Sequence, residues 1–138
     1  MIRTALVAAA LALTTVPAVA GEPATLSLTF DTGVETGAVM VALYDAATYN
    51  GGQPVRSAMI DVASGQHMTT FQGLPHGDYA VKAFHDTNGN GRLDANPFGA
   101  PIEPYAFSNN ARGNMGPASW DRARFTVSGD TAQTISIR

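Results

Sequence analysis

Short runs in which apolar and polar residues alternate recur along the chain from residue 24 onward. Leu26, Leu28 and Phe30 fall on one face of the first run, at 24–30. Alternation with a period of two over a short run is typical of a half-buried strand. The pattern predicts seven strands, at 24–30, 38–45, 55–62, 66–71, 78–86, 123–128 and 133–138.

The connections between these runs are rich in glycine and asparagine. "SGD" at 128–130 suits a hairpin between the last two strands, and "TYNGGQP" at 48–54 is a reversal that a helix would not tolerate. No run after residue 21 has a helical period. The sequence therefore predicts an all-β fold, an antiparallel seven-stranded β-sandwich in a single domain over 21–138.

One long stretch, 95–121, matches no strand in this interpretation. Loops of this length in a small domain are usually functional or disordered. This one contains Tyr105, Phe107 and Trp120, whereas disordered segments are poor in aromatic residues. We therefore expect one long ordered loop that packs on the sandwich.

The first twenty residues have the composition of a secretory signal. A basic residue, Arg3, precedes an apolar run at 5–13, and the small-x-small triplet at 18–20 suits cleavage before Gly21. The apolar run is shorter than the roughly 20 residues that a membrane-spanning helix needs. We expect residues 1–20 to be removed and the protein to be periplasmic or secreted, with no membrane span after cleavage.

Charge and cysteine content exclude several classes of function. The formal net charge is −3, and Lys82 is the only lysine, so no basic patch exists to neutralise phosphates. Nucleic acid is therefore not an expected partner. The chain has no cysteine, which excludes a disulfide framework, a thiolate zinc site and a thiol nucleophile.

The segment "HDTNGNGRLD", at 85–94, has the spacing of a calcium-binding loop. Side-chain oxygens recur at Asp86, Asn88 and Asn90, a glycine follows, and Asp94 comes four residues after Asn90. Hard cations such as Ca²⁺ take six to eight oxygen ligands in a flexible geometry. The sequence predicts a structural Ca²⁺ site in the 86–103 loop. Its ligands are Asp86, Asn88, Asn90, Arg92 through its carbonyl, Asp94 and Glu103.

Two features distinguish this segment from an EF-hand. Pro97 stands where the bidentate glutamate belongs, and no helices flank the loop, so the later Glu103 would have to close the site. A tight turn is the alternative interpretation. Asp and Asn side chains hydrogen-bond their own backbone in such turns and tolerate left-handed conformations.

Several motifs taken together resemble the Domain of Unknown Function 2141 family of secreted bacterial proteins. They are "GLPHGDYAV", "HDTNGNGRLD", "FGAPIEPYAFSNNA" and "GPASWDRARF", and the resemblance covers about residues 25 to 138. It implies a β-sandwich, transthyretin/prealbumin-like (similar to carboxypeptidase-regulatory domains) or immunoglobulin-like. The "F-x-x-L-P-x-G-x-Y" corner of such domains matches at 71–79. The family has no assigned activity that would transfer to this chain.

An enzyme and a carbohydrate-binding module are the two alternatives to a structural metal site. A periplasmic hydrolase would use His85 with Asp94 or Glu103, although several catalytic groups must converge for such chemistry. The chain ends in "ISIR" and lacks the Tyr-Arg-Gly-Ser ending of transthyretin-like hydrolases. A carbohydrate-binding surface would use Tyr105, Phe107 and Trp120, whereas the competing interpretation places these rings in a small second core.

The sequence thus favours an exported, non-enzymatic binding or adaptor domain with no catalytic residues, whose long loop is clamped by Ca²⁺. Its expected partner is an unknown envelope protein or a glycan. A free edge at the C-terminal strand is one route by which such a domain binds another protein.

Overall fold

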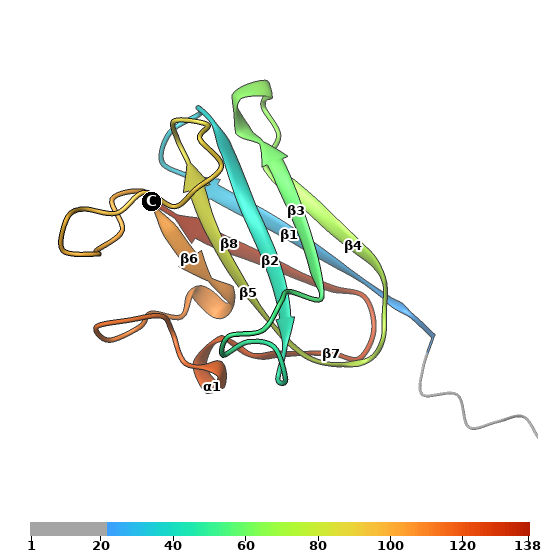
Figure 1. The fold of residues 1–138 in the computed structure, drawn as a ribbon. Coiled ribbons are helices and arrows are strands. Elements are labelled where there is room, and N and C mark those ends of the chain that lie inside the picture. Colours follow the sequence, from blue (N-terminus) through green and yellow to red (C-terminus); the bar gives the residue numbers. More distant parts are fainter. Residues whose placement is uncertain (1–21) are drawn as a thin grey trace, which may run out of the picture.

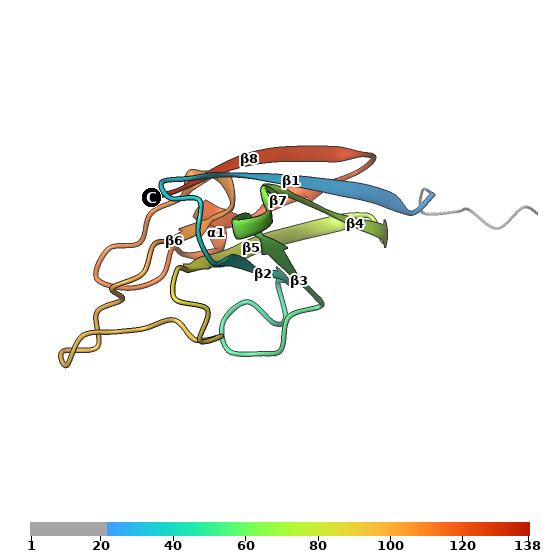
Figure 2. The ribbon, with the colours of Figure 1, turned by 90° about the horizontal axis from the view of Figure 1, so that it is seen from above.

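Two β-sheets face each other across one apolar core, and Figure 2 shows them as an upper and a lower layer. The structure is a computed structural model that describes residues 22–138. The expected signal segment lies outside these residues. The strands are β1 (Ala24–Thr32), β2 (Ala38–Asp45), β3 (Arg56–Asp61), β4 (Met68–Leu74), β5 (Gly77–Asp86), β6 (Tyr105–Phe107), β7 (Phe125–Val127) and β8 (Thr131–Ile137). The helical pieces are two 3-10 turns, η1 (Val62–Ser64) and η2 (Ser108–Asn110), and one short helix, α1 (Trp120–Ala123).

The smaller sheet has the strand order β4-β1-β8, and the larger has the order β3-β2-β5-β6 with β7 also paired to β5 (Figure 1). Burial in β1 and β2 alternates residue by residue, as the sequence predicts. The inward residues of both sheets, among them Leu28, Val41 and Ile135, form one core cluster. The prediction of an all-β sandwich is confirmed.

The strand count and the pairing differ from the prediction. Residues 22–138 contain eight strands, because the stretch 95–121 includes β6. β1 and β8 run parallel, with Leu26 opposite Thr131, so the sandwich is not wholly antiparallel. The turn at 128–130 is not a hairpin, because β7 pairs with β5 in one sheet and β8 pairs with β1 in the other.

The expected corner between β4 and β5 is present. Phe71 and Leu74 belong to the main core. Tyr79 follows on β5, and its hydroxyl donates a hydrogen bond to the Pro75 carbonyl at 2.7 Å. This bond fixes the crossing of the chain from one sheet to the other.

A second apolar cluster lies on the outer face of the larger sheet. Tyr49, Ala80, Phe107, Ala118 and Ala123 form it, and the chain after β6 folds back to cover them. The Tyr49 hydroxyl donates to the Ala118 carbonyl at 2.6 Å. The expected long loop is therefore packed, but β6, η2 and α1 divide it.

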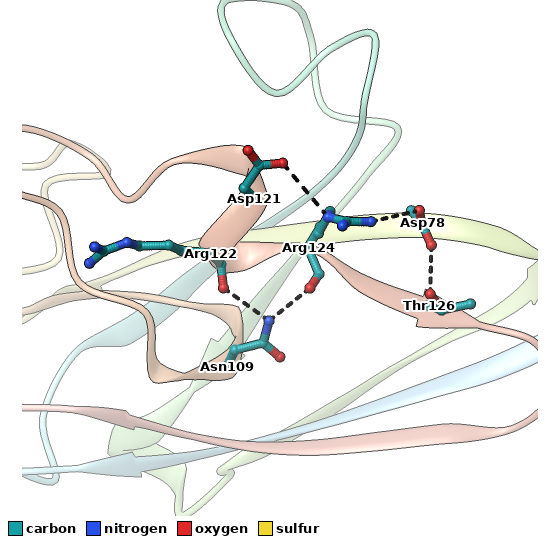
Figure 3. Close-up of polar contacts among 6 residues, drawn as sticks. All are labelled: Asp78, Asn109, Asp121, Arg122, Arg124 and Thr126. Carbon is teal, nitrogen blue, oxygen red and sulfur yellow. Dashed lines mark hydrogen bonds and ion pairs between the residues drawn. The ribbon is translucent and has the colours of Figure 1, made fainter.

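Polar contacts anchor the end of this covering segment (Figure 3). The Asn109 side-chain amide donates to the carbonyls of Arg122 and Arg124, at 3.1 and 2.8 Å. The Arg124 guanidinium lies 3.5 Å from a carboxylate oxygen of Asp78 on β5, and Thr126 donates to the other oxygen at 2.7 Å. These contacts link η2 and α1 to β5 and β7 of the larger sheet.

η2 also covers the free edge of β8. The Ser136 N–H donates to the Asn110 side-chain oxygen at 2.8 Å, and the Asn109 N–H donates to the Gln133 side chain at the same distance. Such contacts hinder this edge strand from pairing with a strand of another chain. In residues 22–138, no helix has the length and apolar character needed to cross a membrane.

Candidate functional site

The predicted metal loop begins where β5 ends, with His85 and Asp86 both buried. On the neighbouring connection between β1 and β2, Gly37 has φ of +67°. A Cβ atom there would lie 2.0 Å from the Asp86 carbonyl oxygen, so only glycine allows this approach. The loop therefore starts from a fixed point of the backbone.

The Asp86 carboxylate organises the first turn of the loop. Its two oxygens accept the N–H groups of Asn90, at 3.2 Å, and of Gly91, at 2.7 Å. Gly89 and Gly91 both have positive φ, 72° and 77°, which glycine adopts without strain. Asp86 is 3% exposed, so these bonds satisfy a carboxylate that water does not reach.

Asn88 and Asn90 each use both ends of the side-chain amide. Their oxygens accept backbone N–H groups two residues ahead, from Asn90 at 3.2 Å and from Arg92 at 2.9 Å. Their NH₂ groups donate to the two oxygens of Asp94, at 2.5 and 2.7 Å. The loop thus contains the hydrogen bonds expected of a tight turn, which was the alternative interpretation of this segment. These bonds orient the NH₂ groups of both amides toward the Asp94 carboxylate.

Glu103 closes the loop from the far side. Its Oε2 accepts the Asp94 N–H at 3.1 Å, and the Ile102 N–H donates to the Asp94 carbonyl at 2.9 Å. Glu103 is 6% exposed, and its Oε1 has no hydrogen-bond partner among the described residues. A buried carboxylate oxygen without a partner is costly, and it marks a place where a cation would be stabilised.

Hydrogen bonds from Asn90 and then Asn88 lower the pKa of Asp94 below its usual value, and Arg92 adds a small contribution in the same direction. Asp94 therefore keeps its negative charge in mildly acidic solution. The loop holds a stable anion beside a second, buried carboxyl group.

The structure brings four of the six predicted ligands together: Asn88, Asn90, Asp94 and Glu103. Asp86 instead accepts hydrogen bonds from backbone N–H groups of the loop, and Arg92 is exposed. Within residues 22–138, no three His, Cys, Asp or Glu side chains gather in a group that could hold a metal ion. Ion binding would require both asparagine amides to rotate, so that oxygen replaces NH₂ beside Asp94. The metal site stays a prediction.

The residues considered for catalysis are placed differently. His85 is fully buried, and its Nε2 lies 2.6 Å from the Thr36 carbonyl oxygen. It alternates with Asp86 along β5, so the two side chains point to opposite faces of the sheet. Ser108 on η2, which the hydrolase prediction does not include, is also fully buried, and its hydroxyl accepts the Val81 N–H and donates to the Ala123 carbonyl.

The three rings considered for sugar binding do not share an exposed face. Tyr105 is 47% exposed, whereas Phe107 is buried and Trp120 packs on the Tyr49 ring at a centroid distance of 5.6 Å. Phe107 belongs to the second cluster, against which the half-buried Trp120 packs.

Sequence reasoning missed a set of residues on the outer face of the larger sheet. Lys82 lies there, with its ammonium group 4.8 Å from the Tyr44 ring centroid and 4.2 Å from that of Tyr49. The signal was present in the strand pattern. Phe84 and Met40 occupy the positions that alternate with core residues, where a solvated face would have polar side chains.

Comparison with known proteins identifies one family. The model of a family described as "Uncharacterized protein conserved in bacteria (DUF2141)" matches residues 31–136. No curated protein matches this chain in sequence.

Proposed function

This chain belongs to the uncharacterised bacterial family DUF2141, and we propose that it is an exported, non-enzymatic binding or adaptor domain stabilised by Ca²⁺ in the 86–103 loop. The ligands are the oxygens of Asp94, Glu103, Asn88 and Asn90, with Asp86 fixing the backbone of the loop. The family match confirms the membership expected from the motifs. The ion and the binding role are our proposals.

One observation carries the calcium proposal, namely the unpartnered Oε1 of Glu103. The oxygen is buried in a loop whose neighbouring side chains offer only oxygen and amide groups. A hard cation is the partner that this chemistry favours, because Ca²⁺ accepts carboxylate and amide oxygens in irregular geometry. Mg²⁺ fits less well, since it demands near-octahedral geometry and gives up its water reluctantly.

Without the ion, the NH₂ groups of Asn88 and Asn90 neutralise the two oxygens of Asp94. With the ion, we expect both amides to turn and present oxygen. The hydrogen bonds from both amides to the Asp94 carboxylate would be lost in exchange. We therefore expect weak affinity, on the order of 10⁻⁴ M, as in extracellular calcium modules.

The clamp would fix the position of a segment rather than take part in chemistry. The His85 N–H donates to the Pro104 carbonyl at 2.8 Å, so the loop leaves β5 and returns to it. An ion between Asp94 and Glu103 would strengthen this closure. The intervening residues 95–101 would then keep one arrangement over the outer face of the larger sheet.

A hydrolase using His85 with Asp94 or Glu103 has less support. A substrate would have to displace the core to reach His85, which is fully buried. The carbohydrate alternative has less support too, because Tyr105 alone of the three rings is largely exposed.

The test is thermal unfolding in about 1 mM CaCl₂, in MgCl₂ and in EDTA. With a dissociation constant near 10⁻⁴ M, mass action stabilises the folded state by about 1.4 kcal/mol. For a domain of this size, the melting temperature should rise by about 3–7 °C in calcium and by less in magnesium.

Asp94→Asn should remove most of the calcium effect, because it deletes one of the two charges beside the ion. Asp121→Asn is the matched control, since its side chain is 89% exposed and lies outside the loop. A melting temperature that is the same in calcium and EDTA would refute the calcium clamp.

A further inference from the structure

The outer face of the larger sheet carries an apolar row. In the registers of four neighbouring strands, Met40 lies opposite both Met59 and Phe84, and Phe84 lies opposite Tyr105. Residues directly opposite each other point to the same face of a sheet. Met59 is 64% exposed and Tyr105 is 47% exposed, and the two central side chains are half-buried.

Residues of two loops line a groove together with this row. Leu93 and Phe98 come from the loop after β5, and Met115 comes from the segment before α1. Phe98 is 95% exposed and Met115 is fully exposed. Together these residues line an open groove of about 1150 Å³, large enough for a small ligand. Its lining is mainly apolar, and methionine side chains adapt to varied ligands.

One cation lies in this groove. Lys82 also lines it, two residues before Phe84 along β5. Its Nζ donates to the Tyr49 carbonyl at 2.7 Å, which uses one of three N–H donors. Lys82 forms no ion pair with Asp or Glu in the described part of the chain. Burial lowers its pKa, as expected for an ammonium group without an anion beside it.

We propose that this groove binds a small amphiphile with one anionic head group, such as a long-chain carboxylate. The carboxylate accepts hydrogen bonds from Lys82, and the aliphatic chain lies along the row from Phe84 through Met40 to Met59. Two steps between strands of about 4.8 Å give this part of the row a length of about 10 Å. An unpaired cation beside an apolar groove complements this combination of head and tail.

Other occupants fit the groove less well. The floor is the face of the sheet, where the backbone groups of β2 and β5 are already paired with their neighbours, so a peptide cannot bind by adding a strand. A sugar would need many polar groups, whereas the lining is mainly apolar and offers the hydroxyl groups of Tyr44, Ser57 and Tyr105 beside one lysine.

The inference rests on the proposed binding role and not on the ion, so it is tested without calcium. Dodecanoate, below its critical micelle concentration, is titrated into the purified protein in EDTA and followed by calorimetry. We expect saturable binding at one site. Butyrate, which keeps the head group, and dodecyltrimethylammonium, which reverses the charge, should each bind at least about tenfold more weakly, a difference of about 1.4 kcal/mol.

Two variants locate the site. Lys82→Met keeps an apolar side chain without the charge and should weaken dodecanoate binding about tenfold or more, and Lys82→Arg should restore most of it. Met59→Gln changes an exposed side chain at the far end of the row and should weaken binding several-fold without affecting folding. Asp121→Asn, at an exposed position that does not line the groove, should bind like the wild type.

Several results would overturn the proposal. They are no dodecanoate binding by a folded wild-type protein, equal binding by Lys82→Met, or equal binding of the cationic amphiphile. A dimer in sedimentation that Met59→Gln dissociates would show that a second copy fills the groove instead. Selective binding of an acidic amphipathic peptide, with no dodecanoate binding, would assign the groove to a protein partner.

Discussion

Replacing Glu103 by glutamine tests the calcium loop, because the substitution should raise the stability of the protein without calcium and reduce the stability that calcium adds. The glutamine oxygen can still accept the Asp94 N–H, as Oε2 does now. The new NH₂ group takes the place of Oε1, which has no partner in the described structure. The variant thus removes one buried charge beside Asp94 and leaves the volume unchanged.

The expected magnitudes follow from these contacts. An unpartnered buried charge costs more than an unpartnered neutral amide in the same place, and the neutral group alone costs about 1–3 kcal/mol. Without calcium, Glu103→Gln should therefore be more stable than the wild type, by on the order of 1 kcal/mol and a few degrees of melting temperature. In about 1 mM CaCl₂ the wild type gains about 1.4 kcal/mol, whereas a variant with tenfold weaker affinity gains about 0.4 kcal/mol. The advantage of the variant should disappear.

Differential scanning calorimetry of both proteins in EDTA and in CaCl₂ measures this crossover. Glu22→Gln is the matched control, because Glu22 is exposed at the start of the described chain and the change in charge is the same. If Glu103→Gln is less stable than the wild type in EDTA, Oε1 is satisfied in the folded protein. If the two proteins gain equally from calcium, Glu103 is not a ligand.

Three further predictions concern stability. Tyr49→Phe leaves the Ala118 carbonyl without its buried hydrogen bond and should cost about 1–3 kcal/mol in urea unfolding; an unchanged midpoint would mean that this bond does not hold the second cluster. Gly37→Ala, at a positive φ and against the β5 backbone, should cost more than about 1 kcal/mol, whereas Gly33→Ala, which meets only ordinary contacts, should not. Hydrogen bonds lower the pKa of Asp94 in the folded state, so its contribution to stability is present above its unfolded pKa, near 4, and is lost as pH falls through the lowered value. Asp94→Asn should therefore make the melting temperature in EDTA fall less steeply at acidic pH. An equally steep fall in the variant would contradict this reasoning.

The sequence was sufficient to predict the sandwich because the long strands alternate clearly. β1, β2 and β5 are eight to ten residues long, and each buries one face in the core. β6 has only three residues and follows Pro104, which is too short a run to show a period of two. The parallel pairing of β1 with β8 joins the two ends of the chain, and local alternation contains no information about such a partner.

The candidate site, like the fold, could be predicted from the sequence only in part. The spacing of Asp86, Asn88, Asn90 and Asp94 predicted a loop whose polar groups converge, and these residues are in contact there. The spacing could not predict how each carboxylate is used. Asp86 binds backbone N–H groups, and Glu103, nine residues beyond Asp94, faces the loop with one oxygen unpaired. Those roles depend on the path of the loop between residues 95 and 102.

The outward side chains of β5 connect the parts of the proposed function. Ala80 lies in the second cluster, Lys82 and Phe84 line the groove, and Asp86 holds the loop. The groove therefore lies over the middle of β5, between the second cluster at one end of the strand and the 86–103 loop at the other. The segments that cover these two ends also line the groove. Of these two covering segments, the 86–103 loop is the one whose position can be adjusted. Phe98 is exposed at the tip of this loop, and the two carboxyl groups of the proposed clamp lie at its base. An ion at that base would leave the sheet unchanged and fix the loop, so calcium should act on ligand binding by reducing the motion of one side of the groove.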